Sequence, residues 1–251
     1  MKPANSNLVL YHAWLSSASR RVRFTLEEKT LSYQSIIIDL LKFEQHSPAY
    51  LLLNSNGVVP TLIHRGHSII ESTVICEYLD ATFPEIPLRP VEQRALARMR
   101  VWSKWVDEVV LRAFQVANWN RMMGPTAARW SEEEVKQRLQ LIPMPDRRED
   151  WRRVAREPFT ESEIDHAIAN ISRTLDRMEV DLANGPWLAG EAFSLADIHL
   201  SPYIVRIGEH AERGILLANY PLCEDWWNRL KSRPAFMRAK IEPVTFPALS
   251  Q

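Results

Sequence analysis

A proline stands inside an apolar run, Val58 to Ile63, that otherwise has the composition of a β-strand. Pro60 has no N–H to donate to a sheet, and its ring restricts the backbone of Val59. The run therefore cannot form an ordinary central strand from its first residue. A cis Val59–Pro60 bond at the edge of a sheet would accommodate the proline, and we expect one there.

The segments around this proline alternate between two periodicities. Short β-prone apolar runs alternate with stretches whose apolar residues have the spacing of an amphipathic helix. Two of the runs flank Arg65-Gly66, which is typical of a hairpin turn. The predicted order is βαβαββα, with strands at 8–11, 33–38, 58–63 and 68–70 and helices at 19–29, 43–53 and 72–83.

A change of composition marks the end of this α/β segment. Prolines punctuate residues 84–90, and a charged, helix-forming sequence follows. We expect an N-terminal domain of residues 1–84, a linker of residues 85–91 and an all-helical domain of residues 92–251.

Two patterns in the helical part predict specific elements. Apolar residues recur at helical spacing from Glu92 to about Trp119, which predicts one long amphipathic helix. Ser194 and Asp197 have the spacing of a capping box, so we expect them to start a helix and to be structural rather than catalytic.

Bulk properties exclude several classes of function. Lys and Arg total 31, as do Asp and Glu, so no large field attracts nucleic acid or an anionic membrane. Cys76 and Cys223 are far apart, no apolar run is long enough for a membrane helix, and the N-terminus lacks the pattern of a secretion signal. We therefore expect a cytoplasmic protein. The histidines and cysteines show no metal-ligand spacing, so we assign no metal.

The predicted order resembles a known family. A βαβαββα segment with Val59-Pro60 ahead of its hairpin and Glu71-Ser72 at the start of its last helix resembles the thioredoxin-like domain of cytosolic glutathione transferases. Across essentially the whole chain, this resemblance implies an α/β N-terminal domain followed by an all-α domain, which is the glutathione transferase fold. The stretches similar to bacterial glutathione-dependent β-aryl-etherases of lignin catabolism are 42–47, 71–79, 99–102 and 104–108.

The resemblance implies glutathione as the co-substrate. A cis bond before Pro60 would turn the N–H and C=O of Val59 toward a pocket, where they can pair with the cysteinyl backbone of glutathione. Ser72 at a helix start can bind the γ-glutamyl carboxylate and Glu71 the ammonium group, with plain helix capping as the alternative for both. His46 matches the position that contacts the glycyl carboxylate in several relatives, with a surface histidine as the alternative.

Ser16, Ser17 and Ser19 lie where the family carries its catalytic Tyr, Ser or Cys. Lowering the pKa of a thiol from about 8.5 by roughly two units needs about 2.7 kcal/mol of thiolate stabilisation. A hydroxyl and a helix N-terminus can provide this stabilisation, and the lack of cysteine here favours transferase chemistry over thiol–disulfide exchange. The resemblance favours Ser16, then Ser17, then Ser19, with helix capping as the alternative role.

A second substrate would bind beside the serines. Trp14, Trp119, Met122 and Met123 are candidates to line an apolar pocket for an aromatic electrophile, with core packing as the alternative. The resemblance suggests that the thiolate displaces a phenolate from an activated carbon. An ordinary conjugation would use the same residues. The charged residues 147–150 and 152–153 are expected to be solvated surface.

The alternative function is a non-catalytic binding or interaction protein with the same fold. Val58 stands where the family often has Gln, and this substitution removes a frequent polar contact with glutathione. A homodimer is implied by the resemblance alone.

Overall fold

The structure, a computed structural model, describes residues 7–242. Its only sheet within those residues has the strand order β2-β1-β3-β4. β2 is parallel to β1, with Gln34 opposite Val9, whereas β3 is antiparallel to β1, with Ile63 opposite the same residue. The strands are β1 (Leu8–His12), β2 (Gln34–Ile37), β3 (Thr61–His64) and β4 (His67–Ile69).

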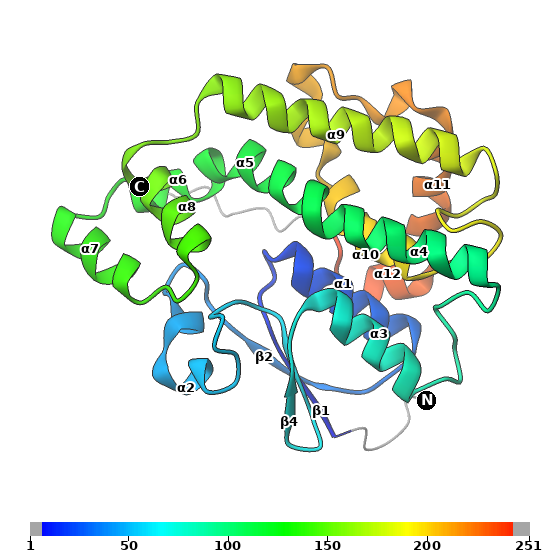
Figure 1. Cartoon of the computed structure of the whole chain (residues 1–251), viewed down its shortest axis with the longest axis horizontal. Helices are drawn as coiled ribbons and strands as arrows, with labels where there is room; N and C mark the ends of the chain where they lie inside the picture. The colour runs from blue at the N-terminus through cyan, green and yellow to red at the C-terminus, as the bar shows by residue number, and fades with distance from the viewer. Residues whose placement is uncertain (1–6, 243–251) are drawn as a thin grey trace.

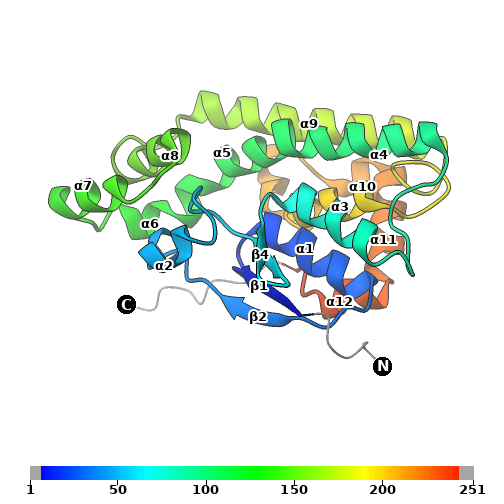
Figure 2. The same cartoon turned by 60° about the horizontal axis from the view of Figure 1, so that its bottom comes forward.

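Two helices lie between this sheet and the rest of the molecule, as Figures 1 and 2 show. They are α1 (Ser17–Glu28) and α3 (Ser72–Thr82), and α1 packs against both α3 and the later helix α10 (Leu195–Ile204). Because α1 is covered by the sheet and by helices, every residue from Ser19 to Glu27 is buried, including the arginines of this segment.

The local predictions around the proline are confirmed, with two differences. The Val59–Pro60 bond is cis, and Arg65 and Gly66 both have positive φ, as a tight hairpin turn requires. Helix α1 begins at Ser17, two residues before the predicted start. The helix predicted at 43–53 is a 3-10 turn, η1 (Glu44–His46), followed by the short α2 (Pro48–Leu51), because Ser47 is extended ahead of Pro48.

The predicted long helix is present and extends further than expected. α4 (Gln93–Trp105) continues through a π-helical segment, η2 (Val106–Val110), into α5 (Leu111–Met122). It runs along the side of the molecule beside α9 (Figure 1). The remaining elements are α6 (Gly124–Ala127), α7 (Glu132–Gln140), α8 (Pro145–Arg156), α9 (Glu161–Leu182), η3 (Ile207–Arg213), η4 (Leu217–Asn219), α11 (Pro221–Lys231) and α12 (Pro234–Arg238).

The capping box of α10 is confirmed and is fully buried. Ser194 caps the helix, and the Asp197 carboxylate accepts from the Ser194 N–H at 2.9 Å. The same carboxylate accepts from the Leu188 N–H at 3.0 Å and from the Trp226 ring N–H at 2.8 Å. Asp197 is therefore a structural joint between α10, α11 and the loop before them. No helix within residues 7–242 is long and apolar enough to cross a membrane.

Candidate functional site

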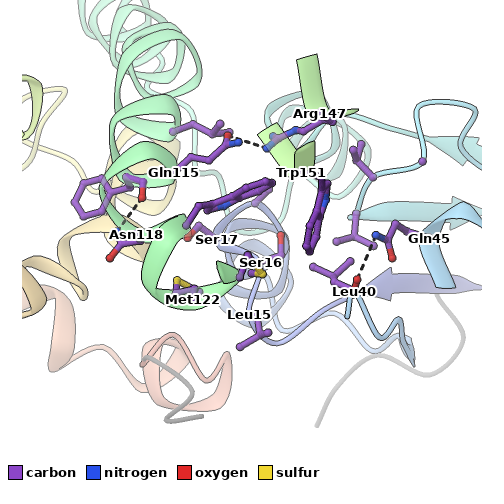
Figure 3. A pocket seen from close by; sticks show the side chains of 18 of the residues that line it. Leu15, Ser16, Ser17, Leu40, Gln45, Gln115, Asn118, Met122, Arg147 and Trp151 are labelled. Carbon is purple, nitrogen blue, oxygen red and sulfur yellow. Dashed lines mark hydrogen bonds between the residues drawn. The ribbon is translucent and has the colours of Figure 1, made fainter. Parts of the chain in front are cut away.

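A cavity of about 210 Å³ opens between the sheet-bearing part and the helices that follow it. The loop after β1, the η1 region and the loop before β3 form one side, while α5, α8 and the end of α10 form the other. A close view shows side chains from both parts pointing toward one another (Figure 3). The residues that line the cavity are Leu15, Ser16, Ser17, Ala18, Leu40, Gln45, His46, Asn56, Gly57, Val58, Val59, Leu111, Phe114, Gln115, Asn118, Trp119, Met122, Met123, Arg147, Trp151, Tyr203 and Arg206.

The three candidate serines occupy different positions at the start of α1. Ser16 is the N-cap of the helix and lines the cavity, and its Oγ accepts from the Ser19 N–H at 3.1 Å. Since a hydroxyl also has one proton to donate, this oxygen can cap the helix and still serve as a donor. Ser17 lines the cavity as well. Ser19 is fully buried outside the lining, and its Oγ accepts from the Ala13 N–H at 3.3 Å.

The N-terminus of α1 contributes positive potential to the same place. Its first turn carries no acidic residue to neutralise the helix dipole. Free N–H groups and the dipole at a helix start favour an anion nearby. Ser16 and Ser17 therefore lie where a thiolate would be stabilised by the backbone as well as by a hydroxyl.

The backbone before the cis proline is held in place from one side and open on the other. The Val58 carbonyl accepts from the Tyr50 hydroxyl at 2.8 Å and from the Asn54 amide at 2.9 Å. Val59 lines the cavity, and neither its N–H nor its C=O is hydrogen-bonded to any residue in the described part of the chain. Its two polar groups are thus available to a peptide ligand lying alongside. Pro60 itself is buried beneath this loop.

The Glu71-Ser72 pair lies at the start of α3, outside the cavity lining. Glu71 has φ 65°, which is uncommon for a residue other than glycine, and it makes no side-chain capping bond to α3. Its carboxylate accepts from the amide of Asn56, a lining residue, at 3.4 Å. Ser72 is buried, and its Oγ accepts from Nη1 of Arg21 at 3.3 Å.

His46 lines the cavity as a buried neutral base rather than as a surface histidine. Its side chain packs edge-to-face on Phe43, with ring centroids 5.3 Å apart, and its Nε2 lies 3.3 Å from the Gln45 amide nitrogen. Burial lowers its pKa to about 4. At neutral pH the ring can therefore offer an N–H to a ligand carboxylate, but it carries no charge.

The helical side of the cavity is aromatic. Trp119, Met122 and Met123 line it, together with Trp151. The ring centroids of Trp119 and Trp151 are 5.5 Å apart. Trp14 lies outside the lining, and the Arg23 guanidinium lies over its ring, 4.6 Å from the ring centroid.

Several lining residues were not anticipated from the sequence. Gln115 and Asn118 of α5, Arg147 of α8, and Tyr203 and Arg206 all face the cavity. The expectation that the charged residues 147–150 and 152–153 are solvated surface is wrong for Arg147, which lines the cavity, and for Asp150, which is buried. The four-residue spacing of Arg147 and Trp151, which puts both on one face of a helix, was the available signal.

No group of three or more His, Cys, Asp or Glu side chains with the arrangement of a metal site occurs within residues 7–242. Both cysteines are buried. The Cys76 thiol is held by a hydrogen bond with Thr25, and burial raises its pKa to about 12.

Comparisons with known proteins match both parts of the chain. The family model described as "Glutathione S-transferase, N-terminal domain" matches residues 10–87, and "Glutathione S-transferase, C-terminal domain" matches residues 143–234. Protein LigF of Sphingobium sp. strain SYK-6 is 34% identical over 94% of this chain and 96% of its own length. Glutathione S-transferase F10 of Arabidopsis thaliana is 24% identical over 90% of this chain and 93% of its own length.

Solved structures show the same relationship. The crystal structure of β-etherase LigF superposes with a TM-score of 0.86 at 33% identity, covering 93% of this chain and 98% of that one. A theta class glutathione S-transferase from Xanthomonas axonopodis pv. citri with glutathione bound has a TM-score of 0.71 at 25% identity, covering 96% and 100% respectively.

Proposed function

Because this chain belongs to the glutathione S-transferase family, we propose that it generates the glutathione thiolate at Ser16 and delivers it to an aromatic electrophile in the adjoining cavity. The observation that carries this proposal is one continuous cavity, bounded by Ser16 and Val59 on one side and by Trp119 and Trp151 on the other. As the similarity to a β-etherase spans nearly the whole chain, β-aryl ethers are the proposed electrophiles.

In this scheme the two proposed domains have separate tasks. The domain of residues 1–84 binds glutathione, the domain of residues 92–251 binds the electrophile, and residues 85–91 connect them. Binding both reactants in one cavity makes a bimolecular reaction effectively unimolecular. This effect can supply a large part of the reduction in the activation barrier.

Glutathione would lie along the loop before β3. Val59 pairs with its cysteinyl backbone as an added strand does, next to Pro60. The γ-glutamyl carboxylate approaches the Ser72 hydroxyl and the N-terminus of α3, and the carboxylate of Glu71 pairs with the ammonium group. His46 donates an N–H to the glycyl carboxylate. The unbonded polar groups of Val59 support this arrangement.

The thiol of glutathione then points toward the N-terminus of α1. The Ser16 hydroxyl donates to the thiolate, with Ser17 as the neighbouring donor, and the helix dipole adds to the stabilisation. Ser19 contributes only indirectly, since its Oγ is occupied by the Ala13 N–H. The thiolate attacks the ether-bearing carbon, a C–S bond forms as the C–O bond breaks, and the electron pair of that bond leaves with the phenolate oxygen.

Calorimetry with glutathione, followed by product analysis with a β-aryl ether dimer, tests the proposal. We expect binding at micromolar to millimolar concentration and equimolar release of a glutathione thioether and a phenol. Absence of binding at millimolar glutathione would rule out the assignment. Binding without turnover of any electrophile would favour the non-catalytic alternative.

The chain is also proposed to form a homodimer through α3 and α4. Val74 on α3 and Val101 on α4 are 55% and 51% exposed, and the two helices lie side by side in both views (Figures 1 and 2). Light scattering on the purified protein should give twice the mass of one chain. Val101→Asp should shift the measured mass toward that of a single chain. A monomeric wild-type protein would contradict the proposal.

A further inference from the structure

The charged residues that line the cavity are of one sign. Two arginines, Arg147 and Arg206, contribute to its wall, whereas none of the lining residues in the described part of the chain is an aspartate or a glutamate. The one lining histidine, His46, is neutral at pH 7 because burial lowers its pKa. The apolar cavity is therefore cationic without a carboxylate of its own.

The two arginines differ in how their charges are balanced. Arg206 forms an ion pair with Glu209 at 2.9 Å and also contacts the sulfur of Met122. The hydrogen bond of Arg147 goes to the side-chain oxygen of Gln115, at 2.8 Å, which is a neutral partner. Of the two guanidinium groups in the wall, Arg147 is the one without a bonded counter-ion among residues 7–242.

The neighbouring carboxylate of Asp150 favours the charge of Arg147 from a distance but is not bonded to it, because its hydrogen bonds go elsewhere. Asp150 forms an ion pair with Arg112 at 2.6 Å and accepts a hydrogen bond from the Gln115 amide nitrogen. Gln115 therefore points its nitrogen at Asp150 and its oxygen at Arg147. This chain of contacts fixes the Arg147 side chain while leaving its charge directed at the cavity.

The surroundings of Arg147 suit a flat ring that carries an anion. Trp151 follows Arg147 by one helical turn on α8. The Arg147 guanidinium lies over the Trp119 ring, with its Cζ 5.8 Å from the ring centroid. In Figure 3, Ser16 and Ser17 lie on one side of Trp151, and Arg147 lies on the other. The serines, both tryptophans and Arg147 all line the same cavity, so a ring held against these tryptophans would share that cavity with the thiolate site and the guanidinium. Burial lowers the pKa of Arg147, because it disfavours the charged guanidinium. A bound anion would stabilise that charge.

From this geometry we propose that Arg147 binds an anionic oxygen on the aromatic part of the electrophile, either a carboxylate already present on the ring or the phenolate oxygen released as the C–O bond breaks. This inference rests on the proposed function and names the chemistry that its cavity selects. A charge-assisted hydrogen bond from a guanidinium to such an oxygen is about twice as strong as a neutral one.

Binding of a matched pair of probes tests the carboxylate form. We would titrate 4-methoxybenzoate and its neutral methyl ester into the full-length protein saturated with S-methylglutathione. The wild-type protein should bind the carboxylate about tenfold more tightly than the ester. Arg147→Gln should remove that preference, and Arg147→Lys should restore part of it, because the charge returns without the planar fork. Arg148→Gln, which removes an exposed charge next to Arg147 on α8, is the control. It should change the affinity for neither probe.

The rates of ether cleavage test the phenolate form. With β-aryl ethers whose leaving phenols span a range of pKa values, Arg147→Gln should lower kcat most for the poorest leaving groups and leave KM nearly unchanged. The proposal is overturned if Arg147→Gln alters neither the carboxylate preference nor this dependence. Glutathione binding should persist in Arg147→Gln, because Arg147 is not among the residues proposed to hold glutathione. A wild-type protein that neither binds glutathione nor turns over benzyl chloride, which has no anionic oxygen, would instead contradict the proposed function.

Discussion

The Arg21 guanidinium donates from Nη1 to the Ser72 hydroxyl oxygen at 3.3 Å, joining the middle of α1 to the first residue of α3. The same fully buried side chain pairs with Asp107 of η2 at 2.5 Å and donates to the Tyr203 hydroxyl of α10 at 2.9 Å. One cation thus ties the proposed γ-glutamyl site to two elements of the helical part. The pKa of Arg21 is raised, although burial alone would lower it, because Tyr203 and Asp107 favour the charged form.

Replacing Arg21 tests this connection. We expect Arg21→Met to lower the free energy of unfolding by about 3 kcal/mol, since it leaves Asp107 and Tyr203 without their buried partner, and Asp107 is exposed enough for water to recover part of the loss. It should also weaken glutathione binding. Urea denaturation and calorimetry measure the two effects. Arg100→Met, which breaks an exposed ion pair with Glu77, should cost less than 1 kcal/mol. Equal effects of the two substitutions would contradict the role given to Arg21.

The Ser16 hydroxyl is both a cap and a proposed donor to the thiolate, and two substitutions separate these roles. Ser16→Ala and Ser16→Gly should both reduce kcat about 10- to 100-fold, because a hydrogen bond to a charged group contributes roughly 1.5–3 kcal/mol. Only the alanine variant should also lose about 1 kcal/mol of stability, since glycine is a tolerated N-cap. Ultraviolet absorbance of bound glutathione would show a raised thiol pKa in both variants.

The same experiment has a clear negative outcome. If Ser16, Ser17 and Ser19 were each changed to alanine without loss of rate, the hydroxyl-assisted mechanism would be wrong. Ser19→Ala is expected to act mainly on stability, because Ser19 is buried and bonded to the Ala13 N–H.

Gly57 leaves room for His46 in the wall of the cavity. A Cβ on Gly57 would lie 2.6 Å from Nδ1 of His46 and 3.0 Å from Cδ of Pro143, at a backbone φ of +62°. We expect Gly57→Ala to destabilise the protein by about 1–3 kcal/mol and to weaken glutathione binding by displacing His46. Thermal unfolding and calorimetry would measure this. Gly208→Ala is the control, since a Cβ there meets no atom within 4 Å.

Buried histidines, among them His12 and His46, should make stability depend on pH. Burial lowers the pKa of His12 and of His46 from 6.5 to about 4, so between those values the unfolded chain binds protons that the folded one does not. The stabilisation is therefore complete above pH 6.5 and is lost as the pH falls toward 4. Each histidine should account for about 2 kcal/mol between pH 7 and pH 5.

Urea denaturation at several pH values measures this dependence, and variants assign it. His46→Asn should reduce the loss of stability between pH 7 and pH 5 by about 2 kcal/mol, which is the share of this one histidine. His67→Asn, at an exposed position in β4, should leave it unchanged. An unaltered pH profile in His46→Asn would show that this histidine does not contribute.

Sequence reasoning succeeded where the constraint is local. The cis bond before Pro60, the hairpin at Arg65-Gly66 and the capping box of Ser194 and Asp197 each follow from the geometry of a few adjacent residues, and all three are present. It was less accurate at the 43–53 segment, where an extended Ser47 ahead of Pro48 divides the predicted helix.

The sequence by itself determined the βαβαββα order of the N-terminal part, because periodicity, turns and caps depend on neighbouring residues, and its resemblance to glutathione transferases implied the fold. Only the tertiary structure decided which of several like residues reach the cavity. Arg147 faces it and Arg148 is exposed, although they are adjacent and chemically the same, and Ser16 faces it whereas Ser19 is buried. The physical reason is the rotation of each helix about its axis, which is set by packing against distant elements, as when Trp151 of α8 meets Trp119 of α5.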